Sequence, residues 1–314
     1  MQGHPSSRSH AIDVWREAVD RAEVSDSGTA TLKSLQAAAA REQMPSACRT
    51  PGFLRACLRA KMYNLQKARR LLANYYTLRN ASGWETLSVR STEESLRSGF
   101  NLLLPSADEH GCAVVTQSLS KLQAACGPDK SLEGLQKAGF YLLHRALERP
   151  EAQRNGIAIV LDFRGFSLMM LRKVKIADFR RGIFMLQDCL PAKLAAIYIL
   201  HQPKWLNVLI ALLTPLVRMP DILTSKFFLC GNNYAALHTH IPAAALPTQL
   251  QVGGTLEYDW DAVVDLWLSQ EDVGNGNTKF DAASLIALGA AVNDRGEEYT
   301  RPASGFRAVS PADR

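Results

Sequence analysis

Short apolar runs between residues 155 and 231 predict a parallel sheet. Residues 157–163 and 194–200 are such runs, rich in β-branched side chains, and residues 226–230 form a third. This composition is typical of parallel strands that are covered on both faces. From Ile176 to Leu190 the apolar residues recur at helical spacing, which predicts a crossover helix between the first two strands. The stretch as a whole predicts a βαβαβ core.

The segment between the second and third predicted strands has an unusual pattern. Residues 205–217 are apolar around almost the whole circumference of a helix, and such a helix must be buried in protein or in lipid. It is far shorter than the roughly 20 residues needed to cross a bilayer, so it cannot span one. Two interpretations remain open at this point: a buried core helix, or a lid over a lipid-filled cavity.

Helical patterns surround this core on both sides. Helices are predicted at residues 11–24 and 31–43, and Thr50 and Asn64 are placed to cap two further helices. Residues 111–116 are predicted to form the first strand of the sheet, followed by a helix over residues 132–148. Near the end of the chain, Asp259 is placed to cap a short helix, and the residues from Gly274 onward are predicted to be mobile.

Composition and charge narrow the class of protein. With 314 residues, 47% of them apolar, the chain can form a sizeable core. The net charge of +6 favours anionic partners, either phospholipid headgroups or nucleic acid. No apolar signal segment is visible near the start, and the six cysteines show no paired or metal-binding spacing. We therefore expect a cytoplasmic protein with reduced, mostly buried thiols.

Residues with the chemistry of an active site do not form a recognisable set. His238 and His240 are two residues apart on a predicted helix, which points their rings to different faces. Asp162 ends a predicted parallel strand, where α/β folds place ligands, but no partner stands at a motif spacing from it. We expect Asp162 to cap the turn that follows. The expected protein is not an enzyme and uses no metal and no cofactor.

Several short motifs occur in the order and spacing of a known family. They are QRNG (153–156), LDFRGF (161–166), LPAKL (190–194), Gln202-Pro203 before the apolar helix, GNNY (231–234), and Leu246-Pro247 followed by Gly253-Gly254. Residues 53–61 and 71–76 resemble the helical leader of the same family. Together these motifs cover about residues 50–267 and resemble the CRAL-TRIO lipid-binding domains, most of all the tocopherol-transfer, retinaldehyde-binding and clavesin group.

The resemblance implies a fold class and a division of the chain. The fold would be an α/β sandwich, in which a mostly parallel sheet flanked by helices encloses a hydrophobic pocket, preceded by an all-α part. The expected parts are an N-terminal tail with helices (1–44), the family's helical N-terminal part (45–95), the lipid-binding domain (96–270) and a mobile C-terminal tail (271–314).

The resemblance also implies that one hydrophobic lipid occupies the pocket as the bound ligand. The residues expected to line it, with ordinary core packing as the alternative for each, are Leu143, Ile157, Ile159, Leu161, Met185, Leu186, Leu190, Ile197, Leu206, Leu209, Ile210 and Leu213. The alternation along residues 157–161 does not decide which face of the sheet they occupy.

The resemblance further implies that basic residues outside the pocket bind phosphoinositides on a membrane. The matching positions are Arg59, Lys61, Lys193 and Lys226. Two positions depart from the family pattern. Ala192 stands where phosphatidylinositol-transfer members have an acidic residue, which argues against a phosphoinositide headgroup inside the pocket. Ala195 stands where a further basic residue is expected, so the basic patch is partial.

These implications combine into one expected function. The protein would bind a tocopherol-, retinoid- or phospholipid-like molecule in its cavity and transfer it between membranes. The alternative is a phosphoinositide-reading adaptor without transferable cargo. The expected partners are the lipid and anionic phosphoinositide membranes, not nucleic acid. The chain is expected to be a monomer without a transmembrane segment, cytoplasmic and peripherally associated with endosomal or other intracellular membranes.

Overall fold

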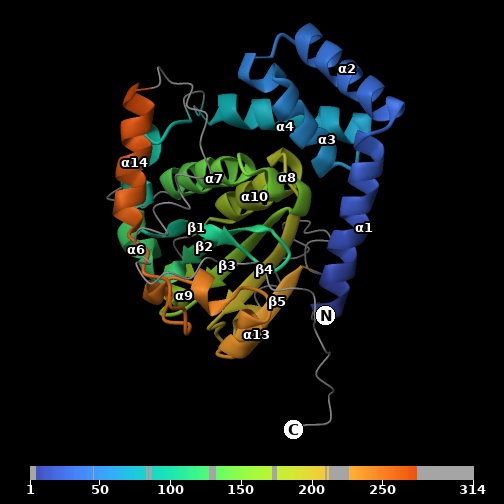
Figure 1. The fold of residues 1–314 in the computed structure, drawn as a ribbon. Helices are drawn as coiled ribbons and strands as arrows, with labels where there is room; N and C mark the ends of the chain where they lie inside the picture. The colour runs from blue at the N-terminus through green and yellow to red at the C-terminus, as the bar shows by residue number, and fades with distance from the viewer. Residues whose placement is uncertain are drawn as a thin grey trace.

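The centre of the fold is a five-stranded sheet with the strand order β1-β2-β3-β4-β5 (Figure 1). The computed structural model describes residues 5–44, 46–82, 84, 87–126, 132–171, 175–208, 211 and 226–273. The strands are β1 (Asn101–Ala107), β2 (Ala113–Ser118), β3 (Ile157–Asp162), β4 (Leu194–Leu200) and β5 (Phe227–Gly231). β2 to β5 pair in parallel, and β1 pairs antiparallel with β2. The α/β class with a mostly parallel sheet is therefore confirmed.

The edge strand β1 was not predicted from the sequence. Its segment contains Pro105 and ends in two exposed residues, Ser106 and Ala107, so its apolar run is limited to three leucines. Proline removes a ladder donor and is tolerated on edge strands such as this one. The strand expected over residues 111–116 corresponds to β2.

The two faces of the sheet carry separate cores. On β3, Ile157 and Ile159 face the first core, whereas Ala158 and Val160 face the second. The first core is completed by α7 (Glu133–Leu147) and α14 (Trp260–Val273), with side chains of α10 (Ile176–Phe184) packed against it. The second is covered by α13 (Tyr234–His238) and the short turns η5 (Ala243–Ala245) and η6 (Thr248–Leu250). This arrangement settles the orientation of residues 157–161.

The predicted crossover helix is divided in two. α10 is followed by one π-helical turn, η4 (Met185–Cys189), which leads into β4. A π-turn widens the helix by one residue and is often found at functional sites. The wider turn places Met185 in the core that the sheet domain shares with the N-terminal helices.

A layer of helices from the N-terminal part lies against α7 and η4 (Figure 1). It contains α2 (Asp26–Arg41), α3 (Pro51–Ala60) and α4 (Leu65–Ala81). The predicted caps are confirmed, because Thr50 accepts the amide of Phe53 and Asn64 accepts the amide of Lys67. The capped helices present the apolar residues of a third core, which Phe140 of α7 joins.

The first helix, α1 (Pro5–Glu23), runs along the side of the molecule (Figure 1). It contacts β4, α2 and α8 (Pro150–Asn155). Its side chains of Ile12, Trp15 and Val19 are buried, at intervals of three and four residues that form one apolar stripe. The stripe packs the part of α1 from Ile12 to Val19 against the rest of the molecule.

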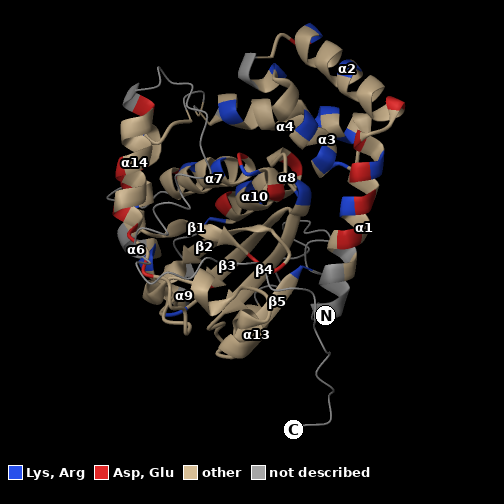
Figure 2. Ribbon diagram, in the orientation of Figure 1, with Lys and Arg blue, Asp and Glu red and all other residues tan. Residues whose placement is uncertain are grey.

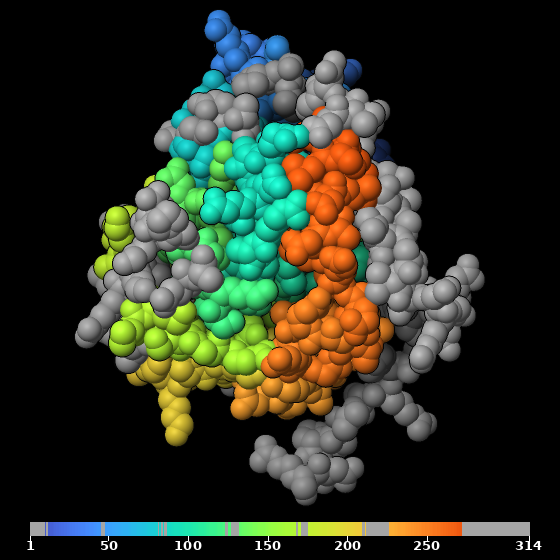
Figure 3. Space-filling model, turned by 90° about the vertical axis from the view of Figure 1, so that its left-hand side faces the viewer, coloured from blue at the N-terminus to red at the C-terminus, as the bar shows by residue number. Residues whose placement is uncertain are grey.

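The helix α14 lies on the side of the molecule opposite α1 (Figure 1) and next to residues 87–107 (Figure 3). The indole nitrogen of Trp260 donates to the carbonyl oxygen of Leu96 at 2.7 Å, and the Tyr258 hydroxyl donates to that of Leu103. The predicted cap is confirmed, because Asp259 accepts the amide of Ala262.

The remaining short elements are η1 (Ser46–Arg49), η2 (Arg90–Thr92), α5 (Glu93–Arg97), η3 (Leu119–Lys121), α6 (Leu122–Ala125) and α9 (Leu168–Leu171). In the part of the chain that the structure describes, no helix combines the length and apolarity that crossing a bilayer requires.

Candidate lipid-binding site

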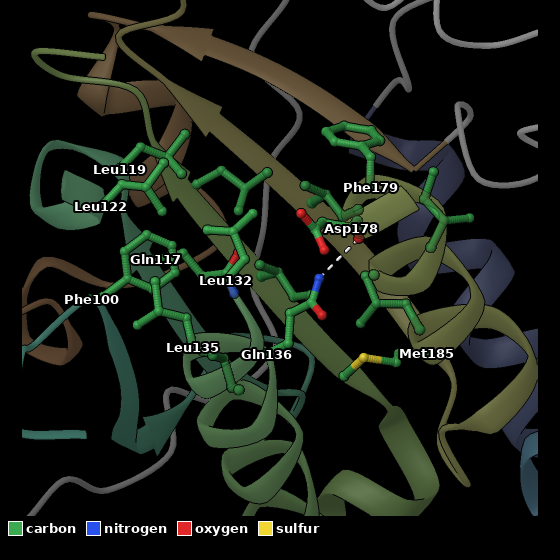
Figure 4. A pocket seen from close by; sticks show the side chains of 18 of the residues that line it. Phe100, Gln117, Leu119, Leu122, Leu132, Leu135, Gln136, Asp178, Phe179 and Met185 are labelled. Atoms are coloured by element: carbon green, nitrogen blue, oxygen red, sulfur yellow. Dashed lines mark hydrogen bonds between the residues drawn. The ribbon is translucent and has the colours of Figure 1, made fainter. Parts of the chain in front are cut away.

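A cavity of about 330 Å³ lies between the sheet and the helices α7 and α10 (Figure 4). Its floor is formed by alternate residues of the strands, among them Val115, Ile159 and Ile197, which all face the first core. The helices close the other side. The cavity therefore follows from the period of two along each strand, which turns one apolar row of every strand toward the same space.

Most of the described residues that were expected to form the lining do so. They are Leu143, Ile159, Leu161, Met185, Leu186, Ile197 and Leu206. The expected residues Leu209, Ile210 and Leu213 lie outside the described residues, as does most of the apolar segment expected to form a lid.

Two expected lining residues are placed elsewhere, in the packed core beside the cavity. Ile157 starts β3 and is opposed by Ala113 and Leu194, so its side chain is enclosed at that end of the sheet. Leu190 follows the π-turn, where its amide donates to the carbonyl oxygen of Met185, and its side chain is 1% exposed. Spacing along the chain could not show that these two residues lie in the packed core and do not reach the cavity.

An aromatic part of the lining was missed by the sequence reasoning. Phe163 and Phe166 line the cavity with their rings in a T-shaped arrangement, and Trp205 packs near Phe166 with a centroid separation of 6.0 Å. Phe163 continues the alternation of Ile159 and Leu161 just past the end of β3. This alternation is the feature of the sequence from which Phe163 could have been added to the predicted lining.

The amide nitrogens of two glutamines at the cavity are engaged with the protein itself. Gln136 donates from Nε2 to the backbone carbonyl oxygen of Asp178 at 2.9 Å (Figure 4). Gln117 donates from Nε2 to Oδ1 of Asn101 at 2.8 Å. None of the described residues that line the cavity is a lysine, an arginine or a histidine, and Asp178 contributes a carboxylate. The described part of the lining is therefore suited to an apolar molecule and offers no cation to a phosphate group.

Large apolar side chains are exposed on the elements next to the cavity. Phe179 lines the cavity and is also 36% exposed, and Ile176 on the same helix is 47% exposed. Met169 on α9 and Val208, two residues after the lining residue Leu206, are more exposed still. We call these four residues the apolar rim. Exposed apolar side chains that adjoin a cavity indicate a surface that meets a membrane or a partner.

The three lysines predicted to bind phosphoinositides come together near the start of β4. Lys61 donates from Nζ to the carbonyl oxygen of Gln187 at 2.9 Å, and Lys226 donates from Nζ to that of Leu194, the neighbour of Lys193. All three lysines are partly buried. Burial lowers the pKa of Lys61, and burial together with the positive charge of Lys61 lowers the pKa of Lys226 to about 8.

Arg59 and Lys193 face the helix α1. The Arg59 guanidinium forms a two-pronged ion pair with Glu23 and also donates to Oε1 of Gln153. Both α1 and α3 carry charged residues along their length (Figure 2). Lys193 places its Nζ 4.7 Å from the centre of the Trp15 ring, within the range of a cation–π contact. The positive charge of Arg59 is therefore already paired, unlike the charges of Lys61 and Lys226, which meet backbone carbonyls.

Asp162 has the capping role that was predicted, and it also contacts a histidine that was not predicted to lie near it. Its Oδ1 accepts the amide of Arg164 at 2.9 Å, which confirms the cap of the following turn. The same oxygen lies 2.7 Å from Nδ1 of His201, whose Nε2 lies 2.6 Å from the Tyr234 hydroxyl. These contacts tie the ends of β3 and β4 to α13. They explain why Asp162 is buried at the end of a strand without facing the cavity.

Comparison with known proteins identifies the family. The chain matches the CRAL/TRIO domain over residues 97–254. A Homo sapiens protein described as "Alpha-tocopherol transfer protein-like" is 30% identical over 226 residues, covering 70% of this chain and 63% of the relative. Clavesin-2 of Rattus norvegicus is 27% identical over 269 residues, covering 83% of this chain and 77% of the relative. The chain therefore belongs to the CRAL/TRIO family of lipid-binding and lipid-transfer domains.

A solved structure supports the fold assignment. The structure titled "Crystal structure of Sfh5" covers 94% of this chain and 100% of its own chain, with a TM-score of 0.50 and 14% sequence identity. This likeness concerns the fold alone. The family resemblance of the sequence motifs is confirmed by the domain match. The aligned region spans 63% of the length of the tocopherol-transfer-like relative.

Proposed function

We propose that this protein is a carrier that holds one neutral hydrophobic lipid in its cavity and moves it between membranes. The observation that supports this most directly is the cavity of about 330 Å³, lined by apolar residues of the sheet, α7 and α10. Its volume lies at the lower end of the roughly 300–1,000 Å³ typical of small-molecule sites. Family membership supports the same class of function.

The chemistry of the lining favours a neutral lipid over a phospholipid. Burying apolar ligand surface contributes about 25 cal/mol per Å² before the costs of association, so a long apolar molecule binds without charged contacts. A phosphate would need a compensating cation, because an unpaired buried charge is costly. Since the described lining has no cationic side chain, a tocopherol- or retinoid-like molecule fits better.

Docking on an anionic membrane would use the apolar rim and the lysines Lys61, Lys193 and Lys226. Burial disfavours the protonated form of both lysines, and the charge of Lys61 adds to this at Lys226. A nearby anion favours the charged form of each. A phosphoinositide headgroup is such an anion. The carrier would dock, exchange its lipid and leave, without catalysing a reaction.

Mass spectrometry of an organic extract tests the carrier function. The protein would be purified, stripped of lipid and incubated with vesicles that contain a neutral isoprenoid lipid. We expect close to one lipid molecule per folded chain, and transfer to acceptor vesicles on subsequent mixing. Folded protein that binds vesicles but extracts no lipid would favour the adaptor without cargo.

Vesicle binding should depend on pH through Lys226. Its pKa in the free protein is lowered to about 8, and a bound anion raises it, so binding takes up a proton. The affinity for phosphoinositide vesicles should therefore fall by about fivefold from pH 7 to pH 9. This corresponds to losing the binding free energy that roughly one lysine contributes. The variant Lys226→Arg should lose this dependence, because arginine stays protonated.

The comparison of the two proteins at each pH removes any effect of pH on the vesicles themselves. Co-sedimentation at fixed ionic strength measures both affinities. Equal pH profiles for the wild type and Lys226→Arg would show that Lys226 does not meet the headgroup.

A further inference from the structure

Three side chains with metal-binding chemistry meet on the face of the sheet that lies away from the cavity. Glu109 and His110 belong to the turn between β1 and β2, and His240 follows α13. Each offers a ligand atom, and these atoms all lie within 4.8 Å of one another. The chain separates Glu109 from His240 by 131 residues, so only the fold brings them together.

Two of the distances among the ligand atoms are close to those of a metal site. Oε1 of Glu109 lies 3.0 Å from Nδ1 of His240 and 3.3 Å from Nε2 of His110. Ligand atoms about 2.0–2.1 Å from a tetrahedral zinc ion are themselves about 3.3 Å apart. A cation can therefore enter between these three atoms with small side-chain adjustments.

The turn that carries two of the ligands is held in place by its backbone. Asp108 is 6% exposed, and its Oδ1 accepts the amides of His110 at 2.9 Å and Cys112 at 2.8 Å. Gly111 adopts a φ of +75°, which the closed turn requires. The amide of Glu109 donates to the carbonyl oxygen of His240 at 3.0 Å, which fixes the turn directly against the third ligand residue.

The third ligand residue is rigid as well. The His240 ring is stacked on Tyr198 with a centroid separation of 5.3 Å and lies 5.8 Å from the Phe228 ring. It is 5% exposed, whereas the Glu109 side chain is 30% exposed. The site therefore has a buried aromatic wall on one side and access to solvent on the other. Such an arrangement holds the ligands in place before an ion arrives.

We propose that Glu109, His110 and His240 bind one divalent transition-metal ion, with Zn²⁺ the best match, and that water completes the coordination. Two imidazole nitrogens and one carboxylate oxygen form a ligand set that Zn²⁺ accepts in a tetrahedral site with one open position. His238 is not a ligand, because its Nε2 lies 2.9 Å from the carbonyl oxygen of Val252. The bound ion clamps the β1–β2 turn onto the segment after α13, and this role is independent of lipid binding.

Metal titration of the chelator-treated, full-length protein tests the proposal. Isothermal titration with Zn²⁺ should show one saturable site per chain, and the melting temperature should rise with Zn²⁺ because the ion binds the folded state. Co²⁺ should give the intense visible absorption of a tetrahedral site. If no saturable site of this stoichiometry is found, the proposal is wrong.

Variants distinguish this site from adventitious binding. Glu109→Gln and His110→Ala should each weaken Zn²⁺ binding by on the order of a hundredfold or more, since losing supporting groups alone costs 10–100-fold. The matched controls His10→Ala, an exposed histidine on α1, and His238→Gln should bind Zn²⁺ as the wild type does. Circular dichroism of the metal-free variants checks that each is folded. If Glu109→Gln has a lowered melting temperature, Zn²⁺ binding by His110→Ala tests the proposal. Unchanged binding in the folded ligand variants would overturn the assignment.

Discussion

Replacing Gly182 by Trp should abolish lipid loading while the sheet stays folded. Gly182 lies on α10 and lines the cavity, and apart from its chain neighbours and the backbone of its own helix no heavy atom lies within 4 Å of the position that a Cβ would take. An indole at this position has room to enter and would occupy the space of the ligand. We expect the loss of bound lipid in organic extracts, measured by mass spectrometry against wild-type protein.

Two matched variants separate blocking of the cavity from damage to the fold. Gly182→Ala should keep lipid loading and stabilise α10 by up to about 1 kcal/mol, the difference in helix propensity between the two residues. Gly52→Trp tests the bulky side chain elsewhere, because Gly52 on α3 also has open space and does not line the cavity. It should load lipid normally. Normal loading of folded Gly182→Trp would refute the assignment of this cavity as the lipid site.

The parallel part of the fold could be predicted because the relevant signal is local. Each buried strand is a short apolar run, and the capping residues Thr50 and Asn64 stand directly before their helices. β1 could not be predicted in this way. Its ladder depends on pairing Leu102 and Leu103 with Thr116 and Val115, a tertiary contact that outweighs the presence of Pro105.

The cavity could be predicted only in part, because its walls are those apolar residues that no other side chain covers in the folded chain. The alternation of β3 was visible in the sequence, but the face that holds α7 and α10 was not. Ile157 and Ile159 share that face, yet only Ile159 reaches the open space. The cluster of Glu109, His110 and His240 could not be predicted from the sequence either, because its members meet only in the folded chain.

The basic positions show a similar limit. The family pattern points to Arg59 and Lys193 by their place in motifs, but it carries no information about α1. In the structure Glu23 pairs with Arg59, and the Trp15 ring covers Lys193. α1 therefore adds partners to two of the four predicted basic residues, and we expect Arg59 to hold α1 in place more than it binds an anion.

Replacing Lys61, Lys193 and Lys226 together by Ala should weaken binding to phosphoinositide vesicles by about a hundredfold, since each lysine near an anionic surface contributes on the order of 1 kcal/mol. Lys61 and Lys226 lie close enough for one charge to lower the pKa of the other, and both are partly buried. An anion that binds near them relieves the repulsion that Lys61 exerts on Lys226. The loss should shrink at high salt, because ions screen the attraction.

The control for this variant removes the same charge elsewhere. Lys33, Arg41 and Lys121 are exposed residues of α2 and η3, and replacing all three by Ala lowers the net charge equally. This control should lose much less affinity, because a specific site depends on the position of the charges and a general attraction depends on their number. Co-sedimentation at low and physiological salt measures both variants, and organic extraction should show unchanged lipid loading in each. Equal affinities of the two triple variants would contradict a docking site at these lysines and leave the apolar rim as the membrane contact to examine.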